Sequence, residues 1–330
     1  MLKLYAGERA KGIEAVIKAS KLCQAVFNKL VKSQTLVKED ASPVTVADFG
    51  AQAVVNHIIH QAFPNDPIVG EEDSKDLREN QSLCDKVVEL TNSVVETPLS
   101  TKQILDAIDL GNYKGGPQGR FWTLDPIDGT KGFLRGEQFA VCLSLIVNGE
   151  VKVAIQGCPN LPRNINDPNS QRGSLMVAVK HQGVFERSFE DSKETRVKVA
   201  DAESPSDTSF CESVEAAHSN QSDTFKIAEL LNIKNKPIRM DSQCKYAVIA
   251  RGDAGIYLRI PTRADYQEKI WDHAGGSLMV SEAGGKVTDI DGKELDFSQG
   301  RTLKSNRGII ATNGKIHDQV LNAVKQVLHK

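Results

Sequence analysis

The sequence of 330 residues lacks several features that identify major classes of protein. No apolar run approaches the roughly 18 residues of a membrane-spanning helix. The six cysteines are scattered without a C-x-x-C pair, which disfavours a zinc knuckle or a disulfide scaffold and indicates reduced thiols. Aromatic residues make up only 5%, and 41 basic against 43 acidic residues leave no long-range basic field for polymeric nucleic acid. We therefore expect a soluble, enzyme-sized protein that binds neither membranes nor polymeric nucleic acid.

The first residues do not resemble a secretory signal. Lys3, Glu8, Arg9 and Glu14 interrupt them before any apolar stretch develops. We expect a cytoplasmic protein, although these residues leave an organellar isoform open. Nothing in the chain points to an obligate protein partner.

The pattern of apolar residues changes near residue 200. Two helical patterns and then five strand-like runs precede it, at 4–31, 43–63, 121–124, 139–147, 151–157, 174–179 and 183–189. Asn148-Gly149 and Gln182-Gly183 suit tight hairpin turns, so these strands are expected to form an antiparallel sheet. Helices at 222–231, 243–251, 274–282 and 316–328 then alternate with strands at 237–240, 255–260, 286–289 and 308–312. We predict an N-terminal α+β lobe (1–200), a C-terminal α/β lobe (201–330) and an active site between them.

A polar stretch at 73–103 interrupts the first lobe. Its apolar residues are weakly patterned, with one helical signal near 82–94. We interpret it as an exposed excursion that carries no function.

The segment Asp125-Pro126-Ile127-Asp128-Gly129-Thr130 follows an apolar strand pattern. Pro126 and Gly129 turn the backbone, so that both carboxylates and the Ile127 carbonyl can point to one place. Hard oxygen atoms at this density suit Mg²⁺. An isolated D-x-x-D is more often an Asx turn whose aspartates bond the backbone, and the motif alone leaves that alternative open.

Three further acids occupy similar positions. Glu71 follows the short apolar run Ile68-Val69-Gly70, and Asp48 lies near a helix start, where a capping role is the simpler explanation. Asp272 heads a helix that begins Ala274-Gly275-Gly276, as if another group must approach it closely. Together with the first motif, these acids supply the carboxylates that a two-metal phosphoryl-transfer site requires.

The acidic motifs also carry a family resemblance. In this order, G-E-E at 70–72, D-P-I-D-G-T at 125–130 and W-D-H-A-G-G at 271–276 resemble the Mg²⁺-dependent, lithium-sensitive phosphatases that include the inositol monophosphatases. The segments K-G-F-L-R-G-E-Q-F-A at 131–140, Y-L-R at 257–259 and Y-Q-E-K-I-W-D at 266–272 are similar to the eukaryotic 3'(2'),5'-bisphosphate nucleotidases of that family. The similarity extends from about residue 4 to the C-terminus, with little of it at 73–103.

The resemblance implies a fold of the α+β or α/β class, a layered α-β-α-β-α sandwich. It also implies two or more Mg²⁺ ions, held by Glu71, Asp125, the Ile127 carbonyl, Asp128 and Asp272. Asp48 and Thr130 would orient and deprotonate the attacking water. That pairing is chemically reasonable, because a threonine hydroxyl is a poor base unless a carboxylate relays its proton.

The same resemblance implies residues that bind the substrate. Thr130, His218, Ser242, Lys245 and Arg259 match positions that contact the nucleotide in this family. Arg259 could form a fork with a phosphate, and Lys245 could act as a mobile point charge.

The activity implied is hydrolysis of the 3'-phosphate of 3'-phosphoadenosine 5'-phosphate to AMP and phosphate. The sulfate-donor form, 3'-phosphoadenosine 5'-phosphosulfate, is a second implied substrate, and inhibition by lithium and sodium is implied as well. Inositol polyphosphate 1-phosphatase activity is the alternative, because the same metal frame serves both substrates. A non-catalytic nucleotide or cation sensor is an alternative of another class, although a sensor has no need of the water-activating pair Asp48 and Thr130.

Overall fold

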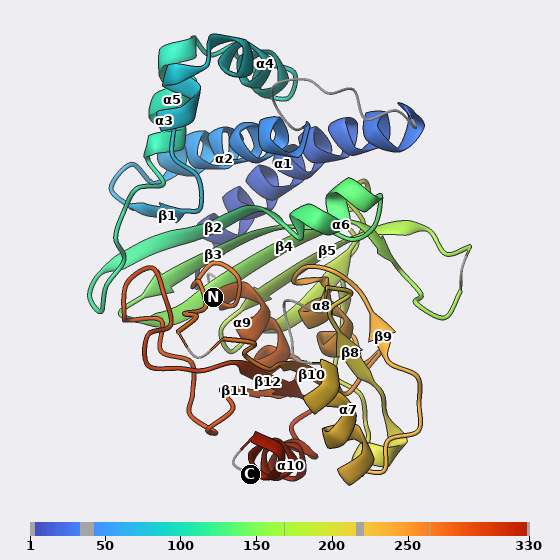
Figure 1. The fold of residues 1–330 in the computed structure, drawn as a ribbon. Coiled ribbons are helices and arrows are strands. Elements are labelled where there is room, and N and C mark those ends of the chain that lie inside the picture. The colour runs from blue at the N-terminus through green and yellow to red at the C-terminus, as the bar shows by residue number, and fades with distance from the viewer. Residues whose placement is uncertain (1–3, 34–42, 168, 216–220, 264, 329–330) are drawn as a thin grey trace.

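The protein is built in layers of helices and sheets (Figure 1). A computed structural model describes residues 4–33, 43–167, 169–215, 221–263 and 265–328. The layers run from helices α1 and α2 through a seven-stranded sheet, helices α8 and α9 and a five-stranded sheet to helices α7 and α10. The predicted α-β-α-β-α arrangement is confirmed. None of the described helices is both long and apolar enough to cross a membrane.

The larger sheet holds its strands in chain order. They are β1 (Ile68–Gly70), β2 (Arg120–Asp128), β3 (Ala140–Val147), β4 (Glu150–Pro162), β5 (Arg172–Val179), β6 (Gly183–Arg187) and β7 (Thr195–Arg196). β1 pairs with β2 in parallel, and the later neighbours pair antiparallel. Asn148 (φ 51°) and Gly149 (φ 78°) connect β3 to β4 with the left-handed backbone that a tight hairpin needs. The predicted antiparallel sheet is therefore confirmed.

Helices α1 (Ala6–Ser33) and α2 (Pro43–Ala62) cover one face of this sheet. Val16 of α1 and Val54 of α2 share a buried core with Leu143 of β3 and Ile155 of β4. This apolar face explains why both helical patterns could be read directly from the sequence.

The stretch 73–103 is more ordered than predicted. It contains α3 (Lys75–Glu79) and α4 (Gln81–Asn92), and α5 (Thr101–Asp109) begins at its end. Leu77, Val87 and Ile104 are buried in one core with Phe49 of α2. The predicted helix near 82–94 is confirmed as α4. The prediction that this stretch is an exposed excursion was wrong, because a few well-spaced apolar residues suffice to pack short helices against α2.

The smaller sheet has the strand order β11-β12-β10-β8-β9. Its strands are β8 (Phe210–Glu212), β9 (Ile238–Arg239), β10 (Ile256–Arg259), β11 (Lys286–Thr288) and β12 (Ile309–Thr312). Helices α7 (Gln221–Leu230) and α10 (His317–Leu328) lie on its outer side, and α8 (Cys244–Ala250) and α9 (Ala274–Glu282) lie between the two sheets. Cys158 of β4, Met279 of α9 and Ala311 of β12 belong to one buried cluster. The two sheets therefore share an apolar core.

The small residues at the start of α9 serve helix packing. A Cβ atom on Gly276 would lie 2.1 Å from the ring of Tyr246 in α8, and one on Gly275 would lie 2.9 Å from the Ser144 hydroxyl. These glycines make room for side chains of the protein itself, and the expected approach of another group to the start of α9 stays a prediction.

We expect Gly276→Ala to destabilise the fold by about 1 to 3 kcal/mol, because the methyl group cannot fit against the buried Tyr246 ring. Urea unfolding measures this change. Gly7→Ala in α1 is the matched control, since no atom lies within 4 Å of its added methyl group. Equal stability of the two variants would contradict the close packing of α8 on α9.

Candidate active site

A polar cavity of about 300 Å³ opens where the two sheets meet. Its walls come from the end of β2, the start of α6 (Thr130–Arg135), the segment before α8, the end of β10 and the segment before α9. The predicted residues that line it are Glu71, Asp125, Ile127, Asp128, Thr130, Ser242, Lys245, Arg259 and Asp272. The structure therefore brings nine of the eleven predicted site residues to one cavity.

The end of β2 delivers the two aspartates. Its pairing with β3 shifts register between Asp125 and Asp128, so a bulge occupies the place where the sequence contains Pro126. Gly129 follows with φ 90°, and a Cβ atom there would lie 2.7 Å from Ser242 Cβ. Asp128 accepts a hydrogen bond from the backbone N–H of Gln243. The turn thus places the β2 carboxylates directly against the segment before α8.

Glu71 is fixed by contacts made to the backbone on either side of it. The Gln52 side chain of α2 donates to the Glu72 carbonyl (2.6 Å) and accepts from the Glu72 N–H (3.0 Å). The Arg301 guanidinium donates to the carbonyl of Gly70 and lies 4.8 Å from the ring centroid of Trp271. Arg301 therefore links the segment of Glu71 to the segment of Asp272.

Asp272 lies beside a buried hydrogen-bond network. Ligand-type atoms of Glu268, Asp272 and His273 come within 4.8 Å of one another. Glu268, however, accepts from Arg259 Nε (2.7 Å) and from His273 Nε2 (3.1 Å), and His273 Nδ1 accepts the Tyr246 hydroxyl (2.8 Å). Glu268 and His273 are thus already engaged, and their arrangement fits a network that orients Arg259 rather than a metal site.

The carboxylates of the cavity repel one another. Burial, followed by the negative charge of Glu71, raises the pKa of Asp125 well above its usual range. Burial, followed by the charge of Asp128, raises the pKa of Glu71 and, by more, the pKa of Asp272. Asp125 Oδ1 is buried and has no hydrogen-bond partner within the described part of the chain. Crowded hard oxygen atoms with an unsatisfied acceptor fit Mg²⁺, which would neutralise this charge.

Asp48 and Thr130 occupy different surroundings. Burial, and then the charges of Glu72 and Glu71, raises the pKa of Asp48 well above its usual range. Similar causes raise the pKa of Glu72 to about 7. The Thr130 hydroxyl lies 3.5 Å from the Ile127 carbonyl, to which it can donate weakly. Asp48 is buried and is not among the described residues that line the cavity, so its relay with Thr130 stays a prediction.

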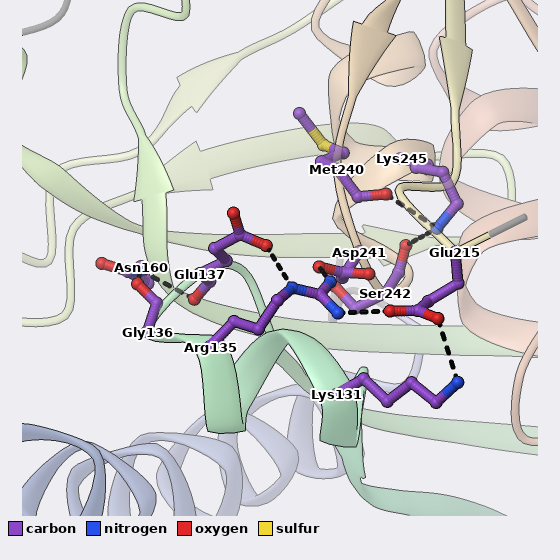
Figure 2. Close-up of polar contacts among 10 residues, drawn as sticks. All are labelled: Lys131, Arg135, Gly136, Glu137, Asn160, Glu215, Met240, Asp241, Ser242 and Lys245. Atoms are coloured by element: carbon purple, nitrogen blue, oxygen red, sulfur yellow. Dashed lines mark hydrogen bonds and ion pairs between the residues drawn. The ribbon is translucent and has the colours of Figure 1, made fainter. Parts of the chain in front are cut away.

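Two of the predicted substrate-binding cations, Lys245 and Arg259, are held firmly by other groups of the protein, and Figure 2 shows the contacts of Lys245. Lys245 is 4% exposed, and its ammonium donates to the carbonyls of Ser242 (2.7 Å) and Met240 (3.4 Å). The expectation of a mobile point charge at Lys245 is wrong, because burial in α8 forces the ammonium to satisfy its donors on the backbone. Arg259 lines the cavity while its Nε binds Glu268. His218 lies outside the described residues.

Comparison with known proteins agrees with this geometry. Residues 8–329 match the sequence profile of the inositol monophosphatase family. The chain belongs to the inositol monophosphatase family. Relatives named 3'(2'),5'-bisphosphate nucleotidase include one from Schizosaccharomyces pombe, 49% identical over 99% of this chain and 97% of that one. Another, from Oryza sativa, is 43% identical over 98% of this chain and 95% of that one.

Solved structures support the family fold. An inositol monophosphatase from Anabaena superposes with a TM-score of 0.61 at 21% identity, covering 96% of this chain and 95% of the other. CysQ from Bacteroides thetaiotaomicron, a bacterial member of the family, gives a TM-score of 0.62 at 20% identity over 94% and 98% of the two chains. At such identity the likeness confirms the layered fold alone.

Several residues of this family member's cavity were missed from the sequence. The described lining also includes Gly129, Lys131, Asp241, Gln243, Tyr257, Tyr266 and His273. All of them except Tyr266 lie within two residues of a predicted site residue, so their position in the sequence could have identified them as candidates. Gln52 and Arg301 gave no such signal, because they reach the site from distant segments.

Proposed function

We propose that this chain removes the 3'-phosphate of 3'-phosphoadenosine 5'-phosphate, giving AMP and phosphate, and also acts on 3'-phosphoadenosine 5'-phosphosulfate. The observation that carries the proposal is that buried carboxylates and cations face one cavity between the proposed lobes 1–200 and 201–330. The bisphosphate nucleotidase names of relatives 41–49% identical to this chain support the choice of substrate. We place the protein in the cytoplasm.

The carboxylates would form the cofactor site. We propose that two or more Mg²⁺ ions are held by Glu71, Asp125, the Ile127 carbonyl, Asp128 and Asp272. When bound, Mg²⁺ supplies neutralising charge and a more acidic water. The unsatisfied Asp125 Oδ1 and the raised pKa values of its neighbours support this ligand set.

The chain's own groups would then handle the proton. Water attacks the phosphorus of the 3'-phosphate and passes its proton to Thr130, while the Thr130 hydroxyl gives its own proton to Asp48. The bond from phosphorus to the 3'-oxygen breaks, and that oxygen takes up a proton from a solvent water molecule as AMP leaves, while Asp48 later returns its proton to solvent. Ser242, Lys245, Arg259 and His218 would hold the nucleotide, with Arg259 oriented by Glu268.

A parallel substrate assay tests the proposal. Phosphate release is measured with Mg²⁺ on 3'-phosphoadenosine 5'-phosphate and on inositol 1,4-bisphosphate at equal concentrations. We expect a clear preference for the nucleotide. Preference for the inositol phosphate would replace this function with an inositol polyphosphate 1-phosphatase, and nucleotide binding without phosphate release would indicate a sensor.

Lithium should inhibit the reaction, because a small monovalent cation can enter a site made of carboxylates without supplying the charge of Mg²⁺. The rate is compared in LiCl, NaCl and KCl at one ionic strength and saturating substrate. We expect the rate to fall in LiCl and to a lesser degree in NaCl, with KCl as the control for salt screening. Equal rates in the three salts would remove lithium sensitivity from this account.

A further inference from the structure

The rim of the cavity carries an ion-pair cluster between α6 and the smaller sheet (Figure 2). Arg135 binds three carboxylates, those of Glu137, Glu215 and Asp241. Lys131, one turn earlier on α6, reaches the same Glu215 with its ammonium at 2.9 Å from Oε2. Glu215 is thus shared by two cations.

The three cations that line the described part of the cavity, Lys131, Lys245 and Arg259, differ in exposure and in how firmly other groups hold them. The side chain of Lys131 is 56% exposed, against 16% for Arg259 and 4% for the whole Lys245 residue. Lys245 is bonded to backbone carbonyls, and Arg259 is bonded to the buried Glu268. Of these three cations, only Lys131 is both exposed in the cavity and paired through an ion pair that can be replaced at little cost. A solvent-exposed ion pair contributes only about 0 to 1 kcal/mol to stability.

The cluster also compensates for the release of Lys131. If its ammonium leaves Glu215, that carboxylate keeps its bond to Arg135. Asp241, the acid of the cluster that lines the cavity, is likewise paired with Arg135, so its charge opposes an incoming anion less. A phosphate dianion can therefore replace Glu215 as the partner of Lys131 at low cost.

We propose that Lys131 is a specificity-determining residue that binds the phosphate not being hydrolysed, and so favours bisphosphorylated nucleotides over monoesters. The inference rests on the proposed function. Lys131 follows Thr130 directly at the start of α6, and both residues line the same cavity, so a second phosphate bound by Lys131 would lie near a reactive phosphate beside Thr130. Mg²⁺ held by the buried carboxylates would contact the phosphate that every substrate of this site shares, whereas Lys131 would bind the second phosphate.

The test compares adenosine 3',5'-bisphosphate with adenosine 3'-phosphate, which lacks the second phosphate. kcat/KM is measured for both, and the monoester is also titrated as a competitor so that its affinity is obtained even at slow turnover. In Lys131→Met we expect the preference for the bisphosphate to fall about tenfold or more, the value of a charge-assisted hydrogen bond. Lys131→Arg should restore most of it.

Lys102→Met is the matched control, because Lys102 is an exposed, ion-paired lysine on α5 outside the cavity. The preference of Lys102→Met for the bisphosphate over the monoester should equal that of the unsubstituted chain. An unchanged preference in Lys131→Met, or equal losses on both ligands, would overturn the assignment. Failure of the unsubstituted chain to hydrolyse the bisphosphate would instead overturn the proposed function, so the two failures are distinct.

Discussion

Asp125→Asn is expected to lower kcat/KM for the bisphosphate by about a hundredfold to a thousandfold, because it removes the charge of a proposed Mg²⁺ ligand. The same substitution should raise the free energy of unfolding by about 1 kcal/mol when a chelator removes divalent cations. The reason is that Asp125 is buried among like charges and its Oδ1 lacks a described partner. Steady-state kinetics and urea unfolding measure the two effects.

Asp289→Asn is the control that distinguishes the loss of a catalytic carboxylate from the general effect of replacing a buried aspartate. Asp289 is fully buried, but its Oδ1 accepts from the N–H groups of Asp291 (2.9 Å) and Lys293 (2.8 Å), and its Oδ2 accepts from Asn306 (3.1 Å). We expect this variant to lose about 1 to 3 kcal/mol of stability and to retain kcat. If Asp125→Asn were also destabilised in chelator while keeping its activity, Asp125 would be a structural acid and the ligand assignment would fail.

Asp48→Asn is expected to lower kcat by about 10² to 10⁴ with a smaller change in KM, because the amide could not accept a proton from Thr130 in the proposed relay. Its buried position in α2 allows the isosteric change without loss of packing. The measurement is saturation kinetics with the bisphosphate at fixed Mg²⁺.

Glu72→Gln provides the comparison for Asp48. Glu72 is a neighbouring carboxylate whose pKa is also raised, with a desolvated site and Glu71 as the causes. Glu72 has no part in the proposed proton relay between Thr130 and Asp48, so we expect a loss of less than about tenfold. A loss equal to that of Asp48→Asn would show that general repulsion, rather than a proton relay, accounts for the effect.

The sequence was most informative where structure is decided locally. The two strands joined at Asn148-Gly149 could be predicted from their apolar residues and from the glycine turn between them, and the structure contains both the strand pair and the turn. Glu71 directly follows β1, Asp125 lies in the last part of β2, and Asp272 lies just before α9. These positions bring the three side chains to one cavity at the junction of the sheets. Local turn chemistry and strand ends therefore predicted the antiparallel sheet and the acidic residues of the cavity, whereas the layered fold and the substrate-binding residues were expected from the family resemblance.

Features that depend on distant contacts could not be predicted in this way. Lys245 was expected to be mobile because most lysines are exposed, yet the packing of α8 buries it. Gln52 and Arg301 fix the Glu71 segment from far along the chain. The apolar residues of α3 and α5 gave a weak pattern because only a narrow face of each short helix docks on α2.

The central claim is that the buried carboxylates direct removal of one particular phosphate. Chromatography of the products formed from adenosine 3',5'-bisphosphate, with Mg²⁺ and with chelator, tests it most directly. The account predicts adenosine 5'-phosphate and one equivalent of phosphate with Mg²⁺, and no reaction with chelator. Formation of adenosine 3'-phosphate, or equal turnover in chelator, would contradict it.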